Sequence, residues 1–138
     1  MIKRYLFVIC FILTILTGCN LNNEKEHYLA LSVDYKTKYT LHQYPWNSSL
    51  NYIEIKLDKN TPEVYLSYFL IPSCNSDIEV LSVESSNPEV ISDEKDDIKI
   101  DTNSRLIKMI AKSTGEAIVT INSKKYGSAT TIKIKIVK

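Results

Sequence analysis

Cysteine and histidine are the side chains here that best suit nucleophilic catalysis or metal binding. The sequence has three cysteines, Cys10, Cys19 and Cys74, and two histidines, His27 and His42. A cysteine nucleophile needs a neighbour that lowers its pKa, and the residues on either side of Cys74 offer none. A Gly-x-Ser-x-Gly turn and a glycine-rich phosphate loop are both missing from the sequence. We therefore expect a protein that is not an enzyme, with no catalytic residue and no cofactor.

Cys19 ends an N-terminal leader, and its chemistry follows from that position. The basic residues Lys3 and Arg4 precede an apolar run, Tyr5 to Leu16, and small residues come after it. This is the pattern of a secretory signal. The run is shorter than the ~20 residues that span a bilayer.

The end of this leader, Leu16-Thr17-Gly18-Cys19, resembles the lipobox of bacterial lipoproteins. In these proteins the cysteine thiol receives a diacylglycerol, and cleavage makes the cysteine the first residue. The resemblance implies a signal peptide over 1–18, lipidation of Cys19 and a polar tether over 19–27. It places the protein at the bacterial cell membrane, lipid-anchored on the extracytoplasmic face. An ordinary secreted protein cut near Gly18 is the alternative.

Two groups of charged residues could bind a ligand. The acidic segment Asp93–Asp97 and Asp101 have the oxygen ligands that calcium prefers, but Lys95 lies in the middle, so we expect a solvated turn and no metal. Lysines near the C-terminus could face anionic lipid or wall polymer, although lysines on a terminal strand more often prevent edge pairing. These lysines are Lys124, Lys125, Lys133, Lys135 and Lys138.

Aromatic residues gather between Tyr28 and Tyr52. The pattern predicts an extra strand within an aromatic-rich segment, 28–49. The residues that keep an alternating phase there are Leu29, Leu31, Val33, Tyr35, Tyr39 and Leu41. Tyrosine and tryptophan stack on sugar rings and anchor protein partners. The predicted ligand-binding residues are Tyr35, Tyr39, Tyr44 and Trp46. The alternative is that these rings only cover the open end of the domain.

Residues 50–138 show the period-two alternation of half-buried strands. The predicted strand segments are Tyr52 to Leu57, Val64 to Leu70, Ile78 to Val83, Ile98 to Asp101, Ala117 to Ile121 and Ile132 to Ile136. Turn residues recur about every ten positions, and helical spacing is absent. We predict an all-β fold, an immunoglobulin-like antiparallel β-sandwich of about seven strands. The connections between the strands are too short to build a pocket, so we expect none.

Two segments resemble a known family. Ser85-Ser86-Asn87-Pro88-Glu89-Val90 and the later Ala111-Lys112-Ser113-Thr114-Gly115-Glu116-Ala117-Ile118-Val119-Thr120 are similar to segments of the bacterial immunoglobulin-like domains of group 2. Leu70-Ile71-Pro72 is similar to the strand-ending proline of that family. The resemblance covers about 50–138 and implies a surface-displayed module of the kind found in adhesins. Val83 replaces a frequent tryptophan and Asn103-Ser104-Arg105 a frequent glycine turn, which marks a divergent member.

Charge narrows the choice of partner. Loss of 1–18 removes two of the 17 basic residues and leaves 15 against 16 acidic ones, too neutral to attract nucleic acid. We therefore predict a monomeric, membrane-anchored lipoprotein that presents a non-catalytic binding or adhesion module to cell-wall, glycan or protein ligands. The alternative is an accessory, immunity or inhibitor lipoprotein that docks onto an envelope protein complex.

Overall fold

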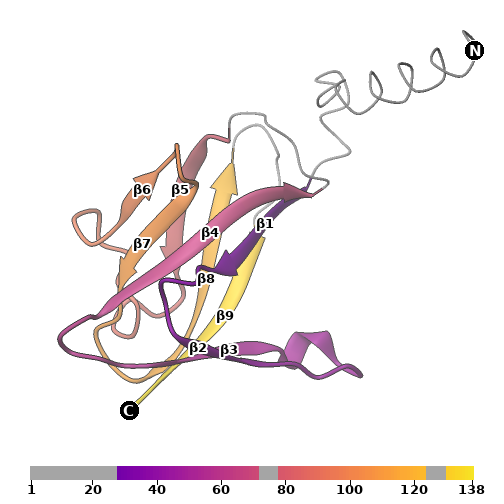
Figure 1. The fold of residues 1–138 in the computed structure, drawn as a ribbon, viewed down its shortest axis with the longest axis vertical. Coiled ribbons are helices and arrows are strands. Elements are labelled where there is room, and N and C mark those ends of the chain that lie inside the picture. The colour runs from indigo at the N-terminus through magenta and orange to yellow at the C-terminus, as the bar shows by residue number, and fades with distance from the viewer. Residues whose placement is uncertain (1–27, 72–77, 124–129) are drawn as a thin grey trace, which may run out of the picture.

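The computed structural model describes residues 28–71, 78–123 and 130–138 (Figure 1). The predicted signal peptide, the lipidation site Cys19, the tether over 19–27 and Cys74 lie outside the described residues. The predictions made for them therefore stay predictions.

Within these described ranges, nine strands form two sheets that pack face to face as a sandwich (Figure 1). The four-stranded sheet has the order β1 (Tyr28–Val33), β4 (Glu63–Ile71), β7 (Leu106–Ile110) and β6 (Lys99–Asp101). The five-stranded sheet has the order β2 (Tyr39–His42), β3 (Tyr52–Lys56), β9 (Thr130–Val137), β8 (Gly115–Ser123) and β5 (Val80–Ser85). Among the described residues, the one helical element is the 3-10 turn η2 (Ser48–Leu50). The predicted all-β sandwich is confirmed.

Two details of the prediction are wrong, although the described part of 50–138 does hold seven strands, β3 to β9. The segment 28–49 contributes two strands, β1 and β2, where we predicted one extra strand. The sandwich is also not wholly antiparallel, because β3 runs parallel to β9, with Ile53 beside Ile134. Parallel neighbours need a long connection, and here the whole chain from β4 to β8 lies between the two strands.

The core follows from the period-two pattern of the long strands. In β4 the alternate residues Val64, Leu66, Tyr68 and Leu70 are all buried, as the sequence predicts. Strands β8 and β9 bury Val119, Ile121, Ile134 and Ile136 in the same way. Each buried aliphatic side chain contributes ~1.5–3 kcal/mol, so these alternating rows drive the two sheets together.

A tight turn carries the chain from the four-stranded sheet to the five-stranded one. The Asp34 carboxylate accepts hydrogen bonds from the Lys36 backbone N–H at 3.0 Å and the Ser67 hydroxyl at 2.8 Å. The buried Thr37 hydroxyl accepts one from the Tyr65 N–H at 2.8 Å. The pairing of β1 with β4 ends at Val33 and Leu66. Beyond that point the Thr37 hydroxyl takes the place of a strand partner for the Tyr65 N–H, because buried backbone groups need partners. The turn therefore fixes where β2 begins.

The two segments that resemble the bacterial immunoglobulin-like family lie against each other. The Ser86 N–H donates to the Ile118 carbonyl at 2.9 Å, and the Ile118 N–H donates to the Ser86 hydroxyl at 2.8 Å. Gly115 adopts a φ of +149°, and an added Cβ would lie 2.6 Å from Val90 Cγ2. Glycine is needed at Gly115 because a side chain would collide with Val90.

Candidate functional site

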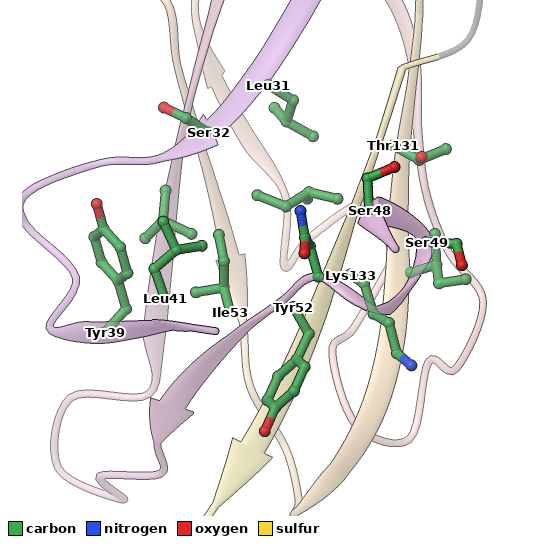
Figure 2. Close-up of a pocket in the computed structure, with 14 residues that line it drawn as sticks. Leu31, Ser32, Tyr39, Leu41, Ser48, Ser49, Tyr52, Ile53, Thr131 and Lys133 are labelled. Carbon is green, nitrogen blue, oxygen red and sulfur yellow. The ribbon is translucent and has the colours of Figure 1, made fainter. Parts of the chain in front are cut away.

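A pocket of about 520 Å³ opens between the facing edges of the two sheets (Figure 2). Strand β1 contributes Leu31, Ser32 and Val33 to it. The β2–β3 hairpin and the connection within it contribute Tyr39, Leu41, Ser48, Ser49, Asn51, Tyr52 and Ile53. Strands β8 and β9 complete the lining with Ile118, Thr131, Ile132 and Lys133. The expectation of no pocket was wrong, because strand edges and η2 form this one rather than long loops.

Tyr39 and Leu41 of β2 form an apolar wall of the pocket. They are exposed because β2 lies beyond the edge of the four-stranded sheet, which therefore does not cover them. In the register of the hairpin, Tyr39 pairs with Ile55 and Leu41 with Ile53. Ile53 and Ile55 face the core and are buried, so Tyr39 and Leu41 project to the same side of the sheet. Both remain about half-exposed. The four-stranded sheet ends at β1, which leaves these two side chains without a layer over them.

A polar wall stands opposite, formed by η2 and the start of β9 (Figure 2). The Asn47 carboxamide accepts from the Ser49 N–H at 3.2 Å and caps η2. The Asn51 carboxamide accepts from the Tyr44 N–H at 2.7 Å and closes the connection between β2 and β3. These bonds hold the hydroxyl groups of Ser48 and Ser49 beside the pocket.

The strand edge beside η2 is also available for pairing. Strand β9 pairs with β3 only from Ile134 to Val137, although β9 itself begins at Thr130. The first part of β9 therefore extends beyond β3 and borders the pocket. Strand β2 is the outermost strand of its sheet. Backbone groups at strand edges bind extended segments of other chains, so the pocket combines apolar side chains with two backbone edges.

The structure brings one of the four predicted ligand-binding residues into this pocket. Tyr39 lines it, whereas Tyr35, Tyr44 and Trp46 are not among the lining residues. Tyr35 is 85% exposed and Trp46 is 95% exposed, so neither ring covers the core. Leu41 belonged to the predicted strand alternation but not to the predicted binding residues, and the sequence pattern did not single out Ser48 or Ser49.

A second group of side chains lies on the outer face of the hairpin. The rings of His42 and Tyr52 stack with their centroids 4.4 Å apart, and Lys135 Nζ lies 5.7 Å from the Tyr52 centroid. His42 Nε2 is 3.6 Å from a carboxylate oxygen of Glu54. These contacts join β2, β3 and β9 and stabilise the hairpin that carries the apolar wall.

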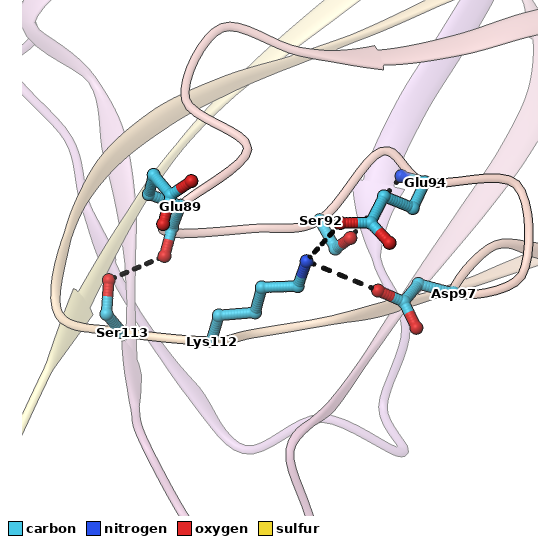
Figure 3. Close-up of polar contacts among 6 residues, drawn as sticks. All are labelled: Glu89, Ser92, Glu94, Asp97, Lys112 and Ser113. Atoms are coloured by element: carbon cyan, nitrogen blue, oxygen red, sulfur yellow. Dashed lines mark hydrogen bonds and ion pairs between the residues drawn. The ribbon is translucent and has the colours of Figure 1, made fainter.

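The acidic segment predicted to be a solvated turn is bound to Lys112 (Figure 3). Lys112 Nζ lies 2.8 Å from Glu94 Oε1 and 3.6 Å from Asp97 Oδ2. The hydrogen bond to Glu94 is the main cause of a raised pKa of Lys112. Beside it the Ser113 hydroxyl donates to the Glu89 carbonyl at 2.6 Å. Across the described residues there is no group of three or more His, Cys, Asp or Glu side chains suited to a metal ion.

The other shifted groups serve turns or the core. The Asn60 N–H lowers the pKa of Asp58, and the Ser104 hydroxyl lowers that of Asp101. Burial raises the pKa of the Tyr68 phenol in the core. Neither carboxylate lines the pocket. Apart from Lys133, whose Nζ lies 3.3 Å from Glu116 Oε2, apolar and uncharged polar side chains line the pocket, which suits binding.

Comparison of the chain with models of known families, with curated proteins and with solved structures found no match. In the described part of the chain, no helix has the length and apolar character needed to cross a membrane.

Proposed function

We propose that this chain is a lipid-anchored protein of the bacterial cell surface whose immunoglobulin-like sandwich binds a ligand at the edge pocket without catalysing a reaction. The observation that carries the proposal is the uncovered apolar wall of Tyr39 and Leu41 beside two strand edges. Exposed apolar side chains at a concave site are favourable contacts for a partner because water is released on binding.

The order of the strands supports the immunoglobulin-like assignment. With β1, β4, β7 and β6 taken as strands A, B, E and D, the four-stranded sheet has the order of one immunoglobulin sheet. Strands β9, β8 and β5 then correspond to G, F and C of the other. β3 adds the parallel partner of the last strand, and β2 is an addition that builds the pocket.

The lipid anchor rests on the resemblance of Leu16-Thr17-Gly18-Cys19 to a lipobox. Two acyl chains on Cys19 would hold the protein at the membrane without a spanning helix. The position of the pocket on the folded domain then makes it available to ligands outside the cell.

The free edges of β2 and β9 favour a protein segment over a glycan as the ligand. An extended segment can pair with a strand edge while its side chains occupy the apolar wall. This same observation supports the second candidate, an accessory, immunity or inhibitor lipoprotein that docks onto an envelope complex. The two candidates share one site and differ in the identity of the captured partner.

Capture from envelope extracts, isolated cell walls and host matrix proteins by the soluble chain 20–138 tests the proposal. Leu41→Ala and Tyr39→Ala alter the apolar wall, whereas Ile100→Ala changes an exposed apolar residue of β6 in the other sheet. We expect both pocket variants to lose at least about tenfold in capture, since one lost anchor costs ~1–2 kcal/mol or more. Ile100→Ala should bind normally. Equal capture by all four proteins would refute the pocket as the binding site.

A further inference from the structure

A second apolar surface lies on the outer face of the four-stranded sheet, away from the pocket. Tyr28 of β1 pairs with Ile71 of β4, and Ala30 pairs with Phe69. The residues between them, Leu29 and Leu70, point into the core and are buried, so these four side chains project outward. Tyr28 is 66% exposed and Ile71 is 51% exposed. We call Tyr28, Ala30, Phe69 and Ile71 the apolar corner.

The same face carries basic side chains farther along the sheet. Lys108 of β7 lies between Tyr65 of β4 and Lys99 of β6 in the strand register. Lys36 Nζ lies 5.5 Å from the centroid of the Tyr65 ring. Three acidic residues lie near these lysines: Glu63 and Asp101 share their strands, and the Asp34 carboxylate accepts from the Ser67 hydroxyl of β4. The charges of the face are therefore nearly balanced, but Lys99 and Lys108 are direct cross-strand partners, and like charges in that position repel each other. Such a lysine pair next to exposed apolar side chains matches anionic lipid headgroups above an acyl layer.

The short length of chain between Cys19 and Tyr28 limits how far the apolar corner can lie from a lipid on Cys19. Tyr28 is the first described residue, and the start of β1 lies beside the end of β4 (Figure 1). Eight residues, 20–27, lie between Cys19 and Tyr28, so nine steps of at most ~3.6 Å each join the two. A lipid on Cys19 would thus keep the apolar corner within about 30 Å of the membrane.

We propose that the apolar corner and the neighbouring lysines dock on the anionic surface of the membrane that holds the lipid of Cys19. This inference rests on the proposed lipid anchor and adds an orientation to it. The outer face of the four-stranded sheet then lies on the headgroups, and the five-stranded sheet faces away. The β2–β3 hairpin belongs to that second sheet, so docking leaves the apolar wall of Tyr39 and Leu41 open to a partner.

Tryptophan fluorescence in vesicles tests this orientation, because the chain has a single tryptophan, Trp46. The mature lipidated protein is reconstituted in vesicles that contain phosphatidylglycerol and brominated phosphatidylcholine, whose bromine quenches tryptophan within the acyl layer. In the Trp46→Phe/Phe69→Trp protein we expect quenching of at least about twofold, since Phe69 belongs to the apolar corner. In the wild-type protein Trp46 belongs to the hairpin and should keep its full intensity.

Two controls separate docking from anchoring. Labelled palmitate on the wild-type protein, absent from Cys19→Ala, reports the anchor alone. Lys99→Glu/Lys108→Glu is added to the Trp46→Phe/Phe69→Trp protein to remove the basic side chains. We expect this change to reduce the bromine quenching to less than half. Replacement of phosphatidylglycerol by a zwitterionic lipid should have the same effect.

Lipidated protein whose Phe69→Trp residue is not quenched would overturn the docking proposal and leave the anchor standing. Protection of that residue from aqueous iodide without bromine quenching would also overturn it, in favour of contact with a second protein. Absence of palmitate from the wild-type protein would refute the anchor and the docking together.

Discussion

Replacement of Leu29 by alanine tests whether the segment before residue 50 belongs to the core. Leu29 lies on β1, pairs with Leu70 and is 5% exposed. Truncation of a buried leucine costs ~2–5 kcal/mol, because transfer energy is lost and a cavity remains. A domain of this size has ~5–15 kcal/mol of total stability, so Leu29→Ala should remove a large fraction of it.

Leu41→Ala is the matched control, with the same chemical change in the same segment. Leu41 lines the pocket and is 50% exposed. Full burial of a leucine contributes ~1.5–3 kcal/mol, and about half of this side chain already contacts water. The expected cost is therefore about 1 kcal/mol or less.

Urea unfolding of the soluble chain 20–138, followed by circular dichroism, measures both costs. With a slope of ~1–3 kcal/mol per molar urea, Leu29→Ala should lower the midpoint by about 1–2 M and Leu41→Ala by less than about 0.5 M. Equal shifts in the two variants, or a cost under about 1 kcal/mol for Leu29→Ala, would show that β1 is peripheral. The domain would then begin near residue 50, as the period-two pattern by itself predicts.

Two further predictions concern a turn glycine and the acid limb of stability. Gly115→Ala should lower the unfolding free energy by about 2–4 kcal/mol, because of backbone strain and the contact of the new Cβ with Val90. The same substitution made in a Val90→Ala background should cost less, because that contact is then removed. An equal cost in both backgrounds would show that backbone strain alone acts at Gly115. Because the folded-state pKa values of Asp58 and Asp101 are lowered from 3.8, their contribution is present above that pH and is lost as the pH falls through the lowered values. Asp58→Asn/Asp101→Asn should therefore be less stable at neutral pH and lose less stability in acid than the wild type, measured by thermal unfolding across pH, and parallel pH profiles would contradict this.

The sequence predicts β9 best, because its apolar residues alternate strictly with lysines from Ile132 to Ile136. The sheet pleat turns that period into one buried face. β7 escaped prediction although Ile107 and Met109 are buried. In Leu106-Ile107-Lys108-Met109-Ile110 the outward positions are also apolar except for Lys108, so the alternation is weak. Pairing with β4 and β6 makes this segment a strand.

The candidate site was only partly predictable. Aromatic enrichment pointed to the segment between Tyr28 and Tyr52 and included Tyr39. It could not separate Tyr39 from Trp46, because the difference lies in the register of β2 against β3. Leu31 and Ile132 reach the pocket from strands that are about 100 residues apart in the sequence. No local pattern records such a juxtaposition.

The sequence alone determined that the body of this protein is an all-β sandwich. A strand with one buried face needs an apolar residue at every second position, and that pattern can be recognised within each segment by itself. It also carried the leader motif at Cys19, whose chemistry needs no tertiary structure to be stated as a prediction. Only the tertiary structure decided that β1 and β2 belong to different sheets, that β3 runs parallel to β9, and that Tyr39 and Leu41 face the core side without a cover. Those features depend on which strand edges meet, and edges meet through contacts between residues far apart in the chain.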